Sequence, residues 1–129
     1  MSDLADLRKA ILRFRDQRNW AKFHTPKNLA AALAIEAAEL QETLLWKTDA
    51  EIQQLLSTRQ GRKEVDNEIA DVLIFAFLMC DAAGTDPAAA VVRKLRHNRE
   101  KYPIARSRNN ALKYTKLRPA KSARKPSSD

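Results

Sequence analysis

The segment "VDNEIADVLIFAFLM", residues 65–79, is the feature that most constrains the fold of this chain. When its residues are placed on a helix they are apolar on nearly every side, and such a helix is usually buried. It nevertheless contains Glu68 and Asp71, and charged side chains are rarely buried without a partner. We therefore expect this helix to pack against other helices, partly those of another subunit in an oligomer.

The composition points to an all-helical protein. The chain has 129 residues, which suits one domain with a real core, and it contains only two glycines. Few stretches show the period-two alternation of β-branched residues that strands require. The sequence therefore predicts an all-α fold.

Start and stop signals divide the chain into helices. Thr25-Pro26 is a helix start with Thr as the N-cap, Thr48 to Glu51 has the capping-box pattern, and Gly84 fits a C-terminal cap. The predicted helices cover residues 3–19, 26–46, 48–56, 63–83 and 87–102. Four long helices joined by short connections predict an antiparallel four-helix bundle.

Charge and cysteine content narrow the possible functions. Residues 104–129 contain eight Lys or Arg and one acid, whereas residues 1–103 contain sixteen basic and fifteen acidic residues. Residues 104–129 therefore carry +7 of the net charge of +8, and we read residues 119–129 as a basic, disordered tail. No nucleic-acid recognition motif accompanies it. The single cysteine, Cys80, excludes a disulfide framework and fits a cytoplasmic protein.

Two helices carry closely spaced acids. Glu36 and Glu39 lie in "LAIEAAELQETLLW", residues 33–46, and "EIAD" repeats the spacing with Glu68 and Asp71. Residues three apart share one side of a helix, so each pair would repel. If the two helices face each other, four carboxylates meet in a partly dry site, which costs several kcal/mol unless a cation compensates. Oxygen ligands favour Mg²⁺ or Mn²⁺ over zinc, and both motifs lack the histidine of di-iron bundles.

A magnesium site suggests a phosphate substrate, and groups suited to a nucleotide flank the acids. Tryptophan stacks on bases, asparagine bonds a base edge or sugar, and lysine meets phosphate. The candidate substrate-binding residues are Trp20, His24, Trp46, Lys94, Asn98 and Tyr102. The tryptophans could equally be core residues, and the last three could form a solvated face.

Several motifs in this order resemble one enzyme family. The stretch from "FRDQRNW" to "LLWKTD", then "EIADVLIF", "KLRHNREKYP" and "KYTKL", is similar to the dCTP pyrophosphatases among the MazG-type all-α nucleoside triphosphate pyrophosphohydrolases. The resemblance covers about residues 10–118. It implies a catalytic domain over residues 1–103 and an extension over 104–118 that packs near it. It also implies a homodimer or homotetramer with sites near subunit interfaces.

The resemblance implies hydrolysis of a nucleoside triphosphate, dCTP foremost, between the α- and β-phosphates. It assigns Glu36, Glu39, Glu68 and Asp71 as ligands of Mg²⁺, with Glu36 or Glu39 as the catalytic base. Two alternatives stay open. The substrate could be dUTP or a modified nucleotide, or the chain could be a non-catalytic helical module that uses its basic tail to bind nucleic acid. We expect no membrane span, because no run of eighteen apolar residues occurs.

Overall fold

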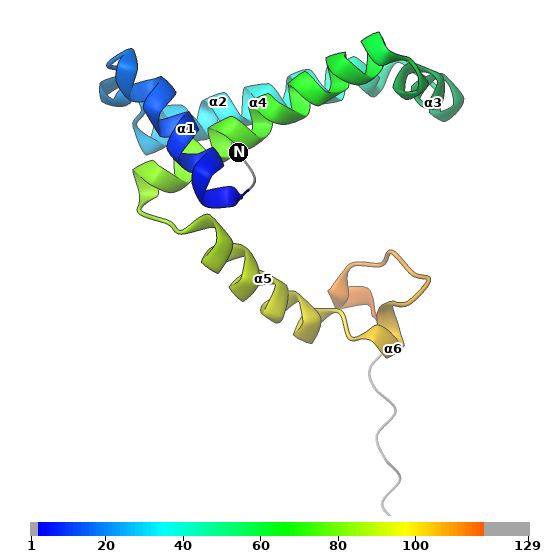
Figure 1. Ribbon diagram of the computed structural model, residues 1–129. Helices are drawn as coiled ribbons and strands as arrows, with labels where there is room; N and C mark the ends of the chain where they lie inside the picture. The colour runs from blue at the N-terminus through cyan, green and yellow to red at the C-terminus, as the bar shows by residue number, and fades with distance from the viewer. Residues whose placement is uncertain (1–2, 118–129) are drawn as a thin grey trace, which may run out of the picture. The chain divides into compact units, whose positions relative to one another are not determined.

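The computed structural model describes residues 3–117 (Figure 1). Every regular element in that range is helical, which confirms the all-α prediction. The elements are α1 (Leu4–Gln17), η1 (Ala21–Phe23), α2 (Pro26–Leu45), α3 (Asp49–Ser57), α4 (Arg59–Ala83), α5 (Pro87–Lys101), α6 (Ile104–Ser107) and η2 (Tyr114–Lys116).

The contacts of the chain separate two units. Among the described residues, 3–87 form one unit, which contains α1 to α4, and 88–117 form a second unit with α5 after its first residue, α6 and η2. The functional division predicted after residue 103 stays a prediction. The tail predicted to be disordered, residues 119–129, lies outside the described residues.

Side-chain caps fix most helix starts where the sequence places them. The Thr25 hydroxyl accepts a hydrogen bond from the backbone N–H of Asn28 at 3.2 Å, and Pro26 occupies the first position of α2. Thr48 and Glu51 form a reciprocal capping box at the start of α3. The hydrogen bond that the Thr48 backbone N–H donates lowers the pKa of the Glu51 carboxyl below its usual value.

The start of α4 differs from the prediction. The sequence "STRQGR" predicts a break with a helix from about residue 63, but α4 begins at Arg59. Thr58 ends α3 and also caps α4, because its hydroxyl accepts a hydrogen bond from the backbone N–H of Gly61 at 3.0 Å. Gly61 is buried, and a Cβ there would collide with the carbonyl oxygen of Leu55. The glycine therefore marks a close approach of two helices instead of a loop.

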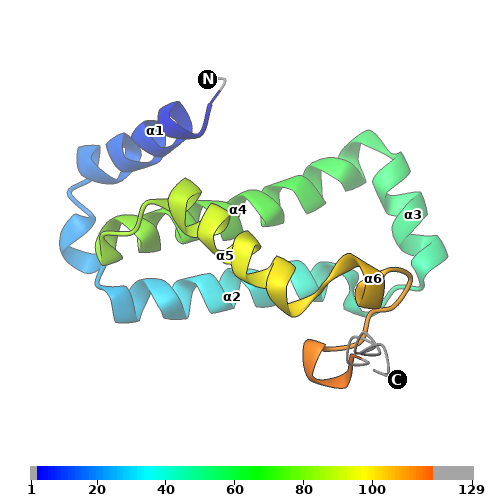
Figure 2. The same cartoon turned by 90° about the horizontal axis from the view of Figure 1, so that it is seen from below.

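The first unit is built around α4. In both views α2 and α4 lie side by side and run in opposite directions, and α1 also packs against α4 (Figures 1 and 2). The buried apolar residues of the described chain are Leu29, Val65, Phe77 and Leu78. Ion pairs add to this contact, because Asp81 of α4 meets Arg15 at 2.7 Å and Arg8 at 3.5 Å, both from α1.

The helix that the sequence predicts to be buried all round keeps one side uncovered within residues 3–117. Ile69 and Leu73 are 42% and 50% exposed, while Val65, Phe77 and Leu78 are buried. Ile35 of α2 is also exposed. Contacts within the first unit therefore leave these three apolar side chains exposed.

The sequence also predicts that the chain has no membrane span. None of the helices in residues 3–117 has the length and apolar character that crossing a bilayer requires.

Candidate functional site

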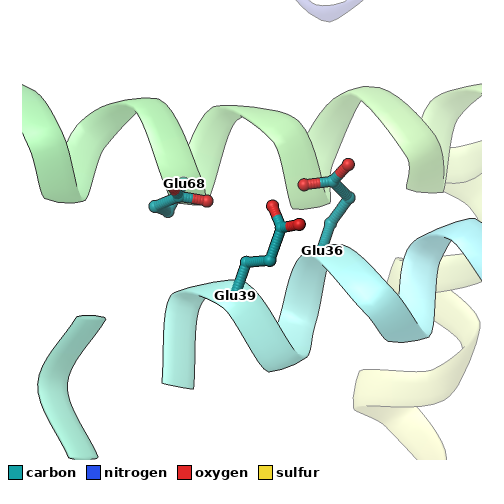
Figure 3. A group of neighbouring side chains, drawn as sticks. All are labelled: Glu36, Glu39 and Glu68. Atoms are coloured by element: carbon teal, nitrogen blue, oxygen red, sulfur yellow. The ribbon is translucent and has the colours of Figure 1, made fainter. Parts of the chain in front are cut away.

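Three of the predicted acids meet where α2 and α4 face each other. Glu36 and Glu39 project from consecutive turns of α2 toward Glu68 of α4 (Figure 3). One carboxylate oxygen from each of the three lies within 4.8 Å of the other two. The antiparallel packing of the two helices thus converts two separate sequence motifs into one acidic cluster.

The carboxylates of the cluster repel one another. Burial raises the pKa of Glu36, and so do its hydrogen bond with Glu39 and the negative charges of Glu39, Asp71 and Glu68. The Oε2 atoms of Glu36 and Glu68 are also buried with no hydrogen-bond partner. Buried carboxylate oxygens without partners are costly. An all-oxygen donor set of this kind fits a hard divalent cation, which would satisfy these oxygens and reverse the mutual repulsion.

Asp71, the fourth predicted acid, lies beside this cluster instead of inside it. Its oxygens are not part of the group that meets within 4.8 Å, although its charge raises the pKa of Glu36. Asp71 instead lines a cavity between α1 and α4. Its role as a metal ligand stays a prediction. Its position connects the acidic cluster to that cavity.

The cavity has a volume of about 400 Å³ and lies between α1, the residues after it, and α4. Its aromatic wall consists of Phe14, Trp20 and Phe75, and its polar lining residues are Arg15, His24 and Asp71. A largely apolar cavity with a few convergent polar groups is typical of small-molecule sites, and this volume lies in their usual range. The structure therefore brings together Trp20 and His24, which the sequence predicts to bind substrate, and Asp71, which it predicts to bind metal.

The remaining predicted substrate residues are Trp46 in the first unit and three residues of the second unit. Trp46 is the C-terminal cap of α2, is 85% exposed, and does not line the cavity. Lys94, Asn98 and Tyr102 belong to the second unit. Lys94 and Asn98 lie one turn apart on one side of α5, whereas Tyr102 follows the last residue of α5 and packs edge-on against Tyr114 with ring centroids 6.1 Å apart. Substrate contact by these four residues stays a prediction.

Sequence reasoning missed Arg15 and Asp81. Arg15 lines the cavity and is held by Asp81, and the sequence motifs point to neither residue. The signal available was spacing, because Arg15 follows the apolar Ile11 by one helical turn and so faces the same side of α1. Glu42, which the sequence places one turn beyond Glu39, borders a shallow groove with Glu39 and Glu68.

An antiparallel helical pair that holds partly buried carboxylates beside an aromatic cavity defines a class of protein, a helical enzyme that binds a cation and an organic ligand at adjoining places. Comparison with known proteins makes this specific. Residues 31–117 match the model of the MazG-like family, and the chain belongs to that family.

Individual relatives agree. The chain is 38% identical to dCTP pyrophosphatase 1 of Rattus norvegicus over 114 residues, which is 88% of this chain and 67% of that protein. It is 36% identical over the same length to dCTP pyrophosphatase 1 of Homo sapiens, again covering 88% and 67%. Among solved structures, it resembles a pyrophosphatase from Archaeoglobus fulgidus with a TM-score of 0.70 and 46% identity, covering 78% of this chain and 92% of that one.

Proposed function

We propose that this nucleoside triphosphate pyrophosphohydrolase acts on dCTP and cleaves it between the α- and β-phosphates to give the monophosphate and pyrophosphate. One observation carries the proposal: the three-carboxylate cluster and the aromatic cavity adjoin, with Asp71 between them. A triphosphate requires charge neutralisation at one end, and its base requires an apolar, aromatic pocket at the other. The names of the relatives, which are dCTP pyrophosphatases, supply the choice of base.

The acids are assigned to the metal. Glu36, Glu39 and Glu68 would hold Mg²⁺, with Mn²⁺ as a substitute, and Asp71 would complete the set from the cavity side. The cation, when bound, neutralises phosphate charge and lowers the pKa of water. The two buried oxygens without partners, on Glu36 and Glu68, support this assignment.

Protein residues then position the reacting groups. Glu39 is exposed, whereas Glu36 and Glu68 are partly buried, so Glu39 is the cluster member most accessible to the attacking water. We assign Glu39 to orient that water and accept its proton, with Glu36 as the neighbouring alternative. Trp20 and His24 hold the base in the cavity, and Lys94, Asn98, Tyr102 and Trp46 provide the remaining contacts to phosphate, sugar and base.

An oligomer is part of the proposal. Exposed apolar side chains on α2 and α4, among them Ile35, Ile69 and Leu73, need a cover that the first unit does not provide. A second copy in a homodimer or homotetramer provides it. Light scattering coupled to gel filtration tests this: Leu73→Arg should yield monomer, and an unchanged mass would place Leu73 outside the interface. We also propose a cytoplasmic location, to which the free thiol of Cys80 is suited.

Product analysis tests the reaction. The protein is incubated with each deoxy- and ribonucleoside triphosphate and Mg²⁺, and the products are resolved by anion exchange. Monophosphate and pyrophosphate, formed fastest from dCTP and abolished by chelator, are the expected result. The same products formed fastest from another nucleotide would move the substrate, and diphosphate with phosphate would contradict the cleavage position. No turnover of any nucleotide would overturn the proposed function.

A further inference from the structure

The cavity wall contains one guanidinium group. Arg15 lies on α1 with only 15% of its side chain exposed, and it lines the cavity together with Phe14 and Trp20. A charged group in apolar surroundings is costly unless other groups pair with it. Arg15 is paired, but its partners occupy only part of its donor capacity.

Two carboxylates fix the orientation of Arg15. Its Nε donates to Asp16 at 2.8 Å and its Nη1 donates to Asp81 at 2.7 Å. Asp81 is itself approached by Arg8 at 3.5 Å. A guanidinium has five N–H donors and no acceptor. Within residues 3–117 the hydrogen bonds of Arg15 use Nε and Nη1, so the two N–H donors of Nη2 are left for a ligand.

A donor-only group discriminates between pyrimidines. Cytosine presents two adjacent acceptors, O2 and N3, whereas uracil and thymine carry a hydrogen on N3. One N–H of a guanidinium can be shared between O2 and N3 of cytosine, but it meets a second donor at N3 of uracil. A buried site that hydrogen-bonds one partner rejects an analogue that leaves its groups unpaired.

We propose that Arg15 determines base specificity by donating from Nη2 to O2 and N3 of a cytosine seated in the cavity, and that Asp81 is the positioning residue that holds it there. The inference rests on the proposed function, since it requires a nucleotide in this cavity. It assigns the base-reading role to a residue on α1, outside the helices that carry the acidic cluster.

Variants of Arg15 test the inference through a ratio of substrates. Arg15→Met keeps much of the length of the side chain but removes all donors, so kcat/KM for dCTP relative to dUTP should fall by about tenfold or more. Arg15→Gln supplies an amide oxygen that can accept from N3–H of uracil, so it should move the ratio further toward dUTP. Arg13→Met, an exposed position on the same helix, is the matched control and should leave the ratio unchanged. An unchanged ratio in both Arg15 variants would overturn the inference.

Asp81→Asn separates positioning from general stability. The substitution weakens the hydrogen bond that Nη1 donates but leaves the guanidinium in place. The ratio of kcat/KM for dCTP to that for dUTP should therefore fall in part, while circular dichroism shows an intact helical fold. A preserved ratio would remove Asp81 from the positioning role.

A substrate analogue tests the same contact in the unaltered protein, in case the Arg15 variants fail to fold. The 2-pyrimidinone deoxynucleoside triphosphate lacks the amino group of cytosine but retains O2 and N3 as acceptors. It should be hydrolysed more like dCTP than like dUTP. Rejection as strong as that of dUTP would show that the amino group is read instead, and would overturn the inference. Turnover of dCTP by the unaltered protein upholds the proposed function in either case, so the two failures are distinguishable.

Discussion

The indole ring of Trp20 stands edge-on against the ring of Phe14, with centroids 5.8 Å apart and an interplanar angle of 75°. This arrangement is favourable for aromatic pairs, and it holds Trp20 at the cavity wall although the residue precedes a short 3₁₀ helix outside the long helices. The guanidinium of Arg18 covers the same Phe14 ring at 3.7 Å. The wall of the cavity is therefore a supported surface on which a base can stack.

Removal of the indole should weaken nucleotide binding. Stacking of a base on an aromatic side chain contributes about 1–3 kcal/mol, so Trp20→Ala should raise KM for dCTP by about tenfold or more while kcat changes less. Trp20→Phe should retain most of the affinity. Phe23→Ala, which removes an exposed ring of the adjacent turn, serves as the control in steady-state kinetics. An unaltered KM in Trp20→Ala would place the base elsewhere.

Neutralising one member of the acidic cluster should abolish hydrolysis without unfolding the protein. Glu68→Gln removes a proposed cation ligand, and kcat/KM should fall by about 10²–10³-fold or more, the scale seen when electrostatic stabilisation of a transition state is lost. The melting temperature measured with chelator should stay equal or rise, because a like charge has been removed. Glu64→Gln is the matched control, since Glu64 is exposed and accepts a hydrogen bond from Gln60 at 3.2 Å. Full activity in Glu68→Gln would refute the cation site.

The raised pKa of Glu36 predicts a specific pH dependence in the metal-free protein. At pH values below the ordinary value of 4.5, Glu36 is protonated in both the folded and unfolded states. As pH rises from there through the raised folded pKa, the unfolded state loses its proton first, and the folded state is destabilised relative to it. The contribution of Glu36 to stability is thus lost as pH rises through this window.

Denaturant unfolding with chelator at a series of pH values measures this effect. The free energy of unfolding of the unaltered protein, taken relative to Glu36→Gln, should decrease across the window. Cation affinity should change in the opposite direction, because a proton competes with the cation for the carboxylate. Parallel curves for the two proteins would show that Glu36 titrates normally.

The buried glycine at the start of α4 should resist substitution. Helix propensity alone favours alanine over glycine by about 0.8–1.0 kcal/mol. At Gly61, however, a Cβ would meet the backbone oxygen of Leu55, and an overpacked contact costs about 1–3 kcal/mol. Gly61→Ala should therefore destabilise the protein, as measured by urea unfolding.

Gly84→Ala provides a comparison with a different cause. Gly84 has φ of 66° at the C-terminal cap of α4, and the position that a methyl group would take there is open space. Its substitution should therefore cost about 1–2 kcal/mol through backbone conformation alone. For the first variant, Gly61→Ala, an increase in the free energy of unfolding would contradict the prediction, because it would mean that the junction of α3 and α4 accommodates the methyl group without cost.

The helices were predictable because their signals are local. Pro26, Gly84 and Pro87 act on their own turns, so the starts and ends they mark were correct to within a residue or two. The start of α4 was not predictable, since "STRQGR" reads as a break until the packing of Gly61 against Leu55 is known.

The candidate site divides in the same way. The convergence of Glu36, Glu39 and Glu68 follows from spacing on two facing helices and was predicted. The position of Asp71 and the presence of Arg15 depend on how α1 crosses α4, which no single segment encodes. Tertiary packing thus determines which side chains join the acids, while helical periodicity determines which acids meet.

Asp71 borders the cavity, and its charge is felt at Glu36 in the acidic cluster. Whatever fills the cavity therefore changes the cost of ionising the cluster, and a cation at the cluster changes the field inside the cavity. By thermodynamic linkage the two affinities must influence each other equally. The nucleotide and the cation should therefore each bind more tightly when the other is present than when either is alone.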